Sequence, residues 1–131
     1  MEGKRTLSRF CIYTMRHTDK LKKAHEKSGS DAVTQNKRWV QGESLFREAQ
    51  ANDERMPILF TAAEDEGGLI FYACLASVEI DDDASQTTHS FSGLTRLDKE
   101  RPKSSLVKRS DNRPLSDDYI RPYAICFTPD I

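Results

Sequence analysis

Cysteine, proline and glycine are scarce in this sequence, with three, five and six residues among 131. With 37% hydrophobic and 31% charged residues, this composition excludes a fibrous chain and a disordered one, and the length predicts a single domain over residues 1–131. The odd number of cysteines excludes the disulfide framework of a small secreted domain and indicates buried thiols in a reducing compartment. Each cysteine lies in an apolar run; they are Cys11, Cys74 and Cys126.

Long apolar runs are also missing. No segment approaches the roughly 18 consecutive apolar residues that a membrane span requires. Residues 1–9 are polar and do not resemble a secretion signal. We therefore expect a cytoplasmic protein without membrane contact. A phosphate-binding loop, a dinucleotide fingerprint and a nucleophile elbow are absent from the sequence as well, so we expect no cofactor.

Charge of one sign does not dominate the chain, whose net charge is −1. The charges are unevenly distributed, because residues 1–30 hold eight Lys or Arg and three acids, whereas residues 41–84 hold two and eleven. Such an asymmetry can create a basic face on a nearly neutral protein. A basic face is one feature of proteins that bind nucleic acids.

The strongest strand pattern covers residues 69–80. This segment is apolar and aromatic after a Gly-Gly pair, which favours a long central strand with a bulge near Ala73 and Cys74. A Gly-rich turn at 64–68 would join it to the preceding strand as a hairpin. The other predicted strands are 9–15, 57–62, 87–94, 106–107 and 123–127.

One helix is predicted at residues 43–51, where three apolar side chains share a face at helical spacing. Residues 18–32 are polar and basic, so a mobile loop is favoured there over a short helix that begins at Thr18 and ends near Gly29. These elements together predict an α+β fold built on a mainly antiparallel sheet.

The order of the elements is informative. A first strand and a polar stretch are followed by an aromatic residue just before the helix, then by Pro57-Ile58-Leu59-Phe60 and by Gly68-Leu69-Ile70-Phe71-Tyr72-Ala73. Over residues 7–80 this layout resembles the PUA-like superfamily, especially its EVE, YTH and ASCH branches. The resemblance implies a strongly bent or barrel-like sheet with flanking helices. It also implies a pocket between the first strand and the helix, where relatives bind RNA or modified bases with aromatic side chains.

Trp39 occupies a place similar to that of such an aromatic residue. Beside Lys37 and Arg38, it would give a stacking surface next to positive charge, the pairing that holds a base and its phosphate. Arg16 and His17 close the first strand, where the pocket of a PUA-like domain would open, and Thr14 in the same strand is a further candidate ligand contact. The alternative for Trp39 is a core position beneath the helix, because aromatic residues are usually buried for packing.

The leading hypothesis is a noncatalytic module that recognises nucleic acid, either RNA or modified DNA. The candidate ligand-binding residues are Thr14, Arg16, Lys37, Arg38 and Trp39. A small hydrolase acting on RNA or a nucleotide, as the ASCH resemblance implies, is the second hypothesis, and a protein-interaction accessory domain is the third. Thiol catalysis is disfavoured because burial would raise the thiol pKa, and the spacing of Asp81-Asp82-Asp83 and His89 matches no metal site. A basic run could contact a nucleic-acid backbone or form a solvated surface; it comprises Lys20, Lys22, Lys23 and Lys27.

Overall fold

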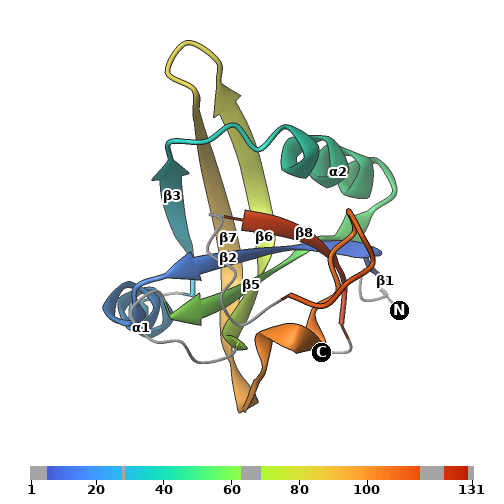
Figure 1. The fold of residues 1–131 in the computed structure, drawn as a ribbon. Helices are drawn as coiled ribbons and strands as arrows, with labels where there is room; N and C mark the ends of the chain where they lie inside the picture. The colour runs from blue at the N-terminus through green and yellow to red at the C-terminus, as the bar shows by residue number, and fades with distance from the viewer. Residues whose placement is uncertain (1–5, 28, 63–68, 116–122, 130–131) are drawn as a thin grey trace, which may run out of the picture.

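A six-stranded sheet forms the framework of the protein in the computed structural model, which describes residues 6–27, 29–62, 69–115 and 123–129 (Figure 1). Two α-helices accompany the sheet, so the fold is α+β as the sequence predicted. Within the described residues, neither helix has the length and apolarity that a membrane crossing requires. The elements are β1 (Thr6–Leu7), β2 (Phe10–Arg16), α1 (Thr18–Lys27), β3 (Asp31–Gln35), α2 (Val40–Ala51), β4 (Glu54–Arg55), β5 (Pro57–Ala62), β6 (Leu69–Asp81), β7 (Gln86–Arg101), the 3-10 helix η1 (Lys103–Ser105) and β8 (Tyr123–Phe127).

The long strand β6 lies in the interior of the sheet, as predicted for residues 69–80. The strand order is β3-β7-β6-β5-β2-β8, and every neighbouring pair is antiparallel except β2 and β5. The register between β6 and β7 shifts at three places, one of them between Tyr72 and Cys74, which confirms the predicted bulge. Bulges bend and twist long strands, and in Figure 1 β6 and β7 run steeply across β2, β5 and β8.

The sheet is open and not closed into a barrel, so the barrel-like form implied by the PUA-like resemblance is not found. Its edge strands, β3 and β8, pair with β7 and β2, and among the described residues they do not pair with each other. Each edge strand has five residues and covers only part of its neighbour. Closure of a barrel requires continuous pairing around the sheet, which these short edges do not provide.

Most predicted elements are confirmed. β5 and β8 have the predicted bounds, and α2 begins three residues before the predicted residue 43. The loop favoured for residues 18–32 is wrong for its first part, which forms α1. Leu21 and Ala24 are buried at a spacing of three while the surrounding side chains are exposed, so two inward residues dock this helix. The turn expected at 64–68 lies outside the described residues.

The strand β3 was not predicted. Its exposure alternates, with Ala32 and Thr34 exposed, and Val33 is the one large apolar side chain that it contributes to the core. Pairing with β7 therefore defines this strand more than its own composition does.

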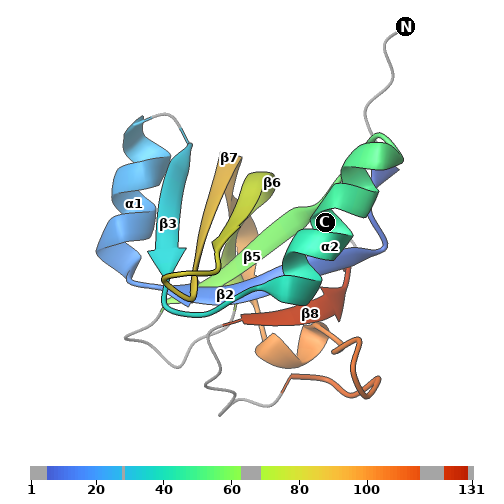
Figure 2. The same ribbon diagram turned by 90° about the horizontal axis from the view of Figure 1, so that it is seen from above.

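Two apolar layers cover the two faces of the sheet. Along β2, Ile12 packs in a cluster with residues of α1 and α2, whereas Tyr13 packs in a second cluster with Leu106 and Leu115. Figure 2 shows the same division, with α1 and α2 on one side of β2 and the segment that contains η1 on the other. Burial on both faces explains why β2 is a nearly continuous apolar run.

Gly29 attaches the end of α1 to β7. Its backbone N–H donates to the carbonyl of Ala24 at 2.8 Å, and its carbonyl accepts from the N–H of Leu94 at 2.9 Å. The backbone of Gly29 is left-handed, with φ of 73°, as is common for glycine just after a helix. A Cβ atom at this position would lie 3.1 Å from the backbone nitrogen of Leu94.

The substitution Gly29→Ala should therefore lower the free energy of unfolding by about 2 kcal/mol, because left-handed strain and a backbone clash add together. Gly93→Ala is the matched control, since Gly93 is also left-handed, with φ of 68°, but a Cβ there meets nothing within 4 Å. We expect about 1 kcal/mol for the control. Urea unfolding measures both, and equal losses would show that the contact with Leu94 does not constrain the turn.

Candidate functional site

Trp39 lies in the middle of a stack of three rings. Its centroid is 4.4 Å from that of His89, with 17° between the ring planes, and 4.6 Å from that of Tyr123, with 21°. Trp39 is fully buried in the core cluster that includes Phe46 of α2. The structure thus has Trp39 in the core position that was the alternative in the sequence analysis. With a ring against each face, Trp39 does not itself present a stacking surface to a base.

Polar side chains fix the orientation of the Trp39 ring. The backbone N–H of Trp39 donates to Thr87 Oγ1 at 2.8 Å, and its Nε1 donates to Gln35 Oε1 at 3.2 Å. Gln35 Nε2 in turn donates to Thr14 Oγ1 at 3.3 Å, and Thr87 Oγ1 donates to the carbonyl of Lys37 at 2.6 Å. Thr14, expected at the mouth of a pocket, is buried in this network. Buried hydrogen-bonded networks of this kind hold one side-chain arrangement.

Arg16 belongs to the same interior region. It forms an ion pair with Asp31 at 2.5 Å, and its guanidinium lies 5.8 Å from the centroid of Phe91. Burial opposes the ionisation of Asp31, but hydrogen bonds from Arg16 and from the N–H of Ala32 outweigh it and lower the pKa of the carboxyl. Among the described residues, Arg16 Nη1 and both ring nitrogens of His89 are buried without a hydrogen-bond partner. Burial, reinforced by the charge of Arg16, lowers the pKa of His89 to about 4.

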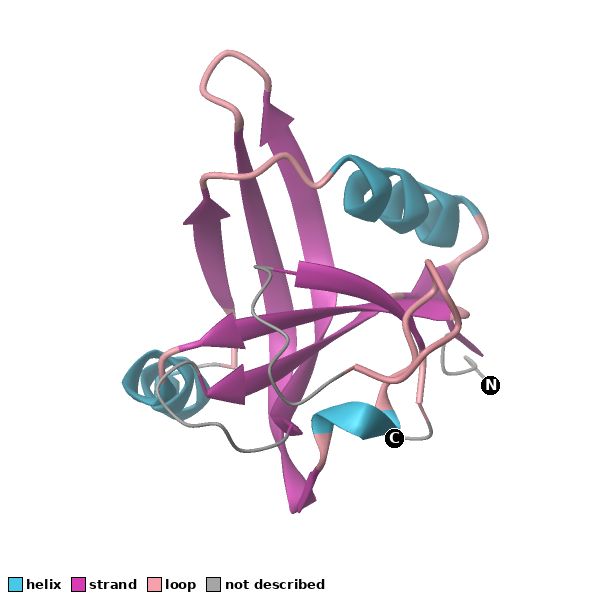
Figure 3. Cartoon of the chain, in the orientation of Figure 1, coloured by secondary structure: helices cyan, strands magenta, loops and turns pink. Residues whose placement is uncertain are grey.

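Lys37 and Arg38 are exposed on the loop between β3 and α2. In Figure 3 this loop passes below the tip of the β6–β7 hairpin, and Arg38 pairs with Asp82 of that tip at 3.5 Å. The structure therefore brings Thr14, Arg16 and Trp39 together in the interior and leaves Lys37 and Arg38 outside it. The basic run of α1 is exposed as well: Lys20, Lys22, Lys23 and Lys27.

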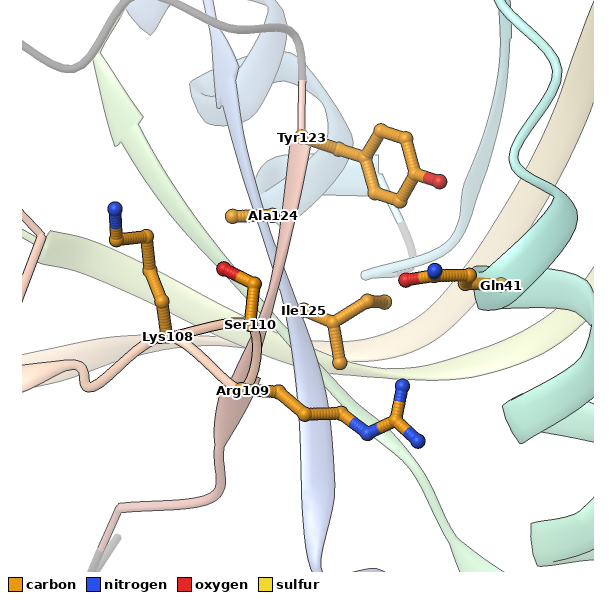
Figure 4. A pocket seen from close by; sticks show the side chains of 7 residues that line it. All are labelled: Gln41, Lys108, Arg109, Ser110, Tyr123, Ala124 and Ile125. Carbon is orange, nitrogen blue, oxygen red and sulfur yellow. The ribbon is translucent and has the colours of Figure 1, made fainter. Parts of the chain in front are cut away.

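A cavity of about 690 Å³ opens at the Tyr123 end of the stack, beside β8 and the first turn of α2 (Figure 4). In Figure 4, the side chains of Tyr123, Ile125 and Arg109 point to the side on which Gln41 of α2 lies, and Lys108 points to the opposite side. We call this space the first cavity. The residues that line it are Gln41, Lys108, Arg109, Ser110, Tyr123, Ala124 and Ile125.

Backbone hydrogen bonds join residues 106–115 to β8 and thereby position Lys108 and Arg109. The N–H of Arg109 donates to the carbonyl of Ile125 at 2.9 Å, and the N–H of Phe127 donates to that of Val107 at 2.8 Å. The predicted strand at 106–107 is thereby reduced to isolated bridges, one of which joins Lys108 to Cys126. Lys108 pairs with Asp111 at 3.1 Å. Arg109 makes no ion pair with a described residue, and its guanidinium lies 5.0 Å from the centroid of the Phe10 ring.

Neither a protein-family model nor a curated protein matches this chain. The function of the candidate site must therefore be inferred from the residues that form it.

Sequence reasoning missed Tyr123, Arg109 and Gln41 as members of one site. The sequence assigned Tyr123 only to the strand predicted at 123–127, and it gave Arg109 no role. The alternation of Tyr123 and Ile125 on one face of β8 was a readable signal, because residues two apart in a strand point the same way. The position of residues 108–110 beside that face could not be predicted from the sequence, because it depends on tertiary contacts with β8.

The described residues offer little for thiol or metal chemistry. Cys11 and Cys126 are buried opposite each other on β2 and β8, and all three cysteines are free. Burial raises the pKa of Cys11 well above its ordinary value and that of Cys126 to about 12, which keeps both thiols protonated and unreactive. Among the described residues, no three His, Cys, Asp or Glu side chains are grouped to hold a metal ion.

The buried imidazole of His89 makes stability depend on pH. The unfolded chain binds a proton at this residue near the ordinary pKa of 6.5, whereas the folded chain resists it until about 4. Stability is therefore full above pH 6.5 and falls by about 3 kcal/mol as the pH decreases toward 4. Urea unfolding across this interval should show the decrease in the wild type and in the exposed control His25→Gln. His89→Phe should abolish most of it, and an unchanged decrease in that variant would contradict the assignment.

Proposed function

We propose that this protein is a noncatalytic module that binds single-stranded nucleic acid, with one nucleotide held in the first cavity. The observation that carries the proposal is the convergence of Tyr123 and Arg109 in a cavity of about 690 Å³, an aromatic ring and a cation that has no acidic partner among the described residues. Small-ligand sites usually occupy about 300 to 1,000 Å³, and a nucleotide needs both a stacking surface and a cation.

The aromatic and polar residues that line the first cavity suit a nucleotide. The ring of Tyr123 is half-buried and fixed by its stack on Trp39, so little side-chain entropy is lost when a base packs on it. Arg109 supplies a charged fork for a phosphate, whereas Lys108 lies on the other side of β8 and is paired with Asp111. Gln41 and Ser110 can donate and accept hydrogen bonds at the edge of a base.

The PUA-like resemblance of the sequence supports the same proposal, since it implies RNA or modified-base binding in a pocket between the first strand and the helix that Trp39 precedes. The cavity lies beside that helix, α2, although the aromatic wall is Tyr123 where Trp39 was expected. A binding role fits this site better than the hydrolase hypothesis, which needs a paired Lys and Glu. Lys108 pairs with Asp111, and no glutamate is among the described residues that line the first cavity.

The single tryptophan is a natural reporter, because Tyr123 joins its ring to the cavity. Titration with short single-stranded RNA and DNA at low salt should change the emission of Trp39. Arg109→Gln should weaken binding about tenfold. It should also reduce the slope of log affinity against log salt concentration by about one, as expected for the loss of one phosphate contact. The exposed Arg96 of β7 lies outside the cavity, so Arg96→Gln is the matched control and should bind like the wild type.

Two outcomes would overturn the proposal. One is that no complex forms with any single-stranded oligonucleotide at low salt. The other is that Arg109→Gln and Arg96→Gln bind equally well, since binding would then depend on diffuse positive charge and not on the first cavity.

A further inference from the structure

A second cavity, of about 260 Å³, lies farther along the same helix. Phe10 of β2 forms one wall, and Leu45 and Glu48 of α2 form another. Arg109 connects the two cavities, because it lines the first and its guanidinium lies 5.0 Å from the centroid of Phe10, which lines the second. Arg9 also lies over the Phe10 ring, at 5.5 Å.

The aromatic residues of the two cavities, Tyr123 and Phe10, are farther apart than the length of one nucleotide. Phe10 is paired with Phe127, which lies four residues beyond Tyr123 on β8. Four residues of strand span about 13 Å. An oligonucleotide can reach both walls if its bases are unstacked from one another, which a single strand allows and a duplex does not.

The second cavity differs from the first in charge. Its lining includes two carboxylates, Glu48 and Glu54, beside one cation, Arg9, whereas the charged residues that line the first cavity are Lys108 and Arg109. Carboxylates repel a phosphate, but they accept hydrogen bonds from the amino groups of bases, as Glu does from N4 of cytosine. The second cavity is therefore suited to a base and not to the backbone, and Arg109 lies between the two cavities, where the intervening phosphate would pass.

We propose that the second cavity is a nucleobase subsite in which a base packs against the wall that contains Phe10, and in which Glu48 and Glu54 select bases that carry an amino group. This inference rests on the proposed function, since it places a second nucleotide of the same strand. Cytosine and adenine are favoured there over thymine and uracil, which offer carbonyl oxygens where the amino groups would be.

The test compares four-nucleotide homopolymers, both DNA and RNA, by the Trp39 titration and by calorimetry. The wild type should bind oligo-C and oligo-A at least tenfold more tightly than oligo-T or oligo-U. The double variant E48Q/E54Q should lose most of this preference, because an amide can also donate to the carbonyl of thymine or uracil. Glu79→Gln is the matched control, since Glu79 is exposed on β6 outside both cavities, and it should keep the preference.

The outcomes separate this inference from the proposed function. If the wild type binds all four homopolymers equally and Arg109→Gln still weakens binding, the subsite is overturned and the nucleotide site at Tyr123 stands. If the preference persists in the double variant, the carboxylates do not select the base and the inference fails as well. If no homopolymer binds, the proposed function fails and the subsite fails with it.

Discussion

The stack of His89, Trp39 and Tyr123 is the interaction on which the site depends. It joins the beginning of α2 to β7 on one side and to β8 on the other, three elements that are far apart in the sequence. Stacked aromatic pairs contribute about 0.5 to 1.5 kcal/mol each beyond their burial, and the hydrogen bonds of Trp39 to Thr87 and Gln35 keep the ring in one orientation. The wall of the first cavity is thereby fixed before any ligand arrives.

Polar groups are buried in the interior behind the stack, and their desolvation is unfavourable. Arg16 and His89 bring polar atoms into the core, and the ion pair with Asp31 compensates only part of their desolvation. His89 stays neutral at ordinary pH because its burial lowers the pKa of the imidazole, and the nearby charge of Arg16 lowers it further. The core therefore combines apolar packing beneath the helices with a local polar region around Arg16 and His89.

The fold was largely readable from the sequence, because β-branched and aromatic runs define strands such as β5 and β8 directly. α1 and β3 were not readable, since Leu21, Ala24 and Val33 carry too weak a pattern without the strands against which they pack. For the site, the sequence drew attention to Trp39 but not to the rings on its two faces. That arrangement depends on the register of β7 and β8, which no local pattern contains.

In the proposed nucleotide site, a base packs against Tyr123 at the end of this stack. Photocrosslinking with a short single-stranded oligonucleotide that carries one 5-iodocytosine, followed by mass spectrometry, tests it most directly, because a crosslink forms only with a side chain in contact with the base. We expect an adduct on Tyr123, with Phe10 as the second position. Adducts confined to the exposed lysines of α1, with Tyr123 unmodified, would contradict it.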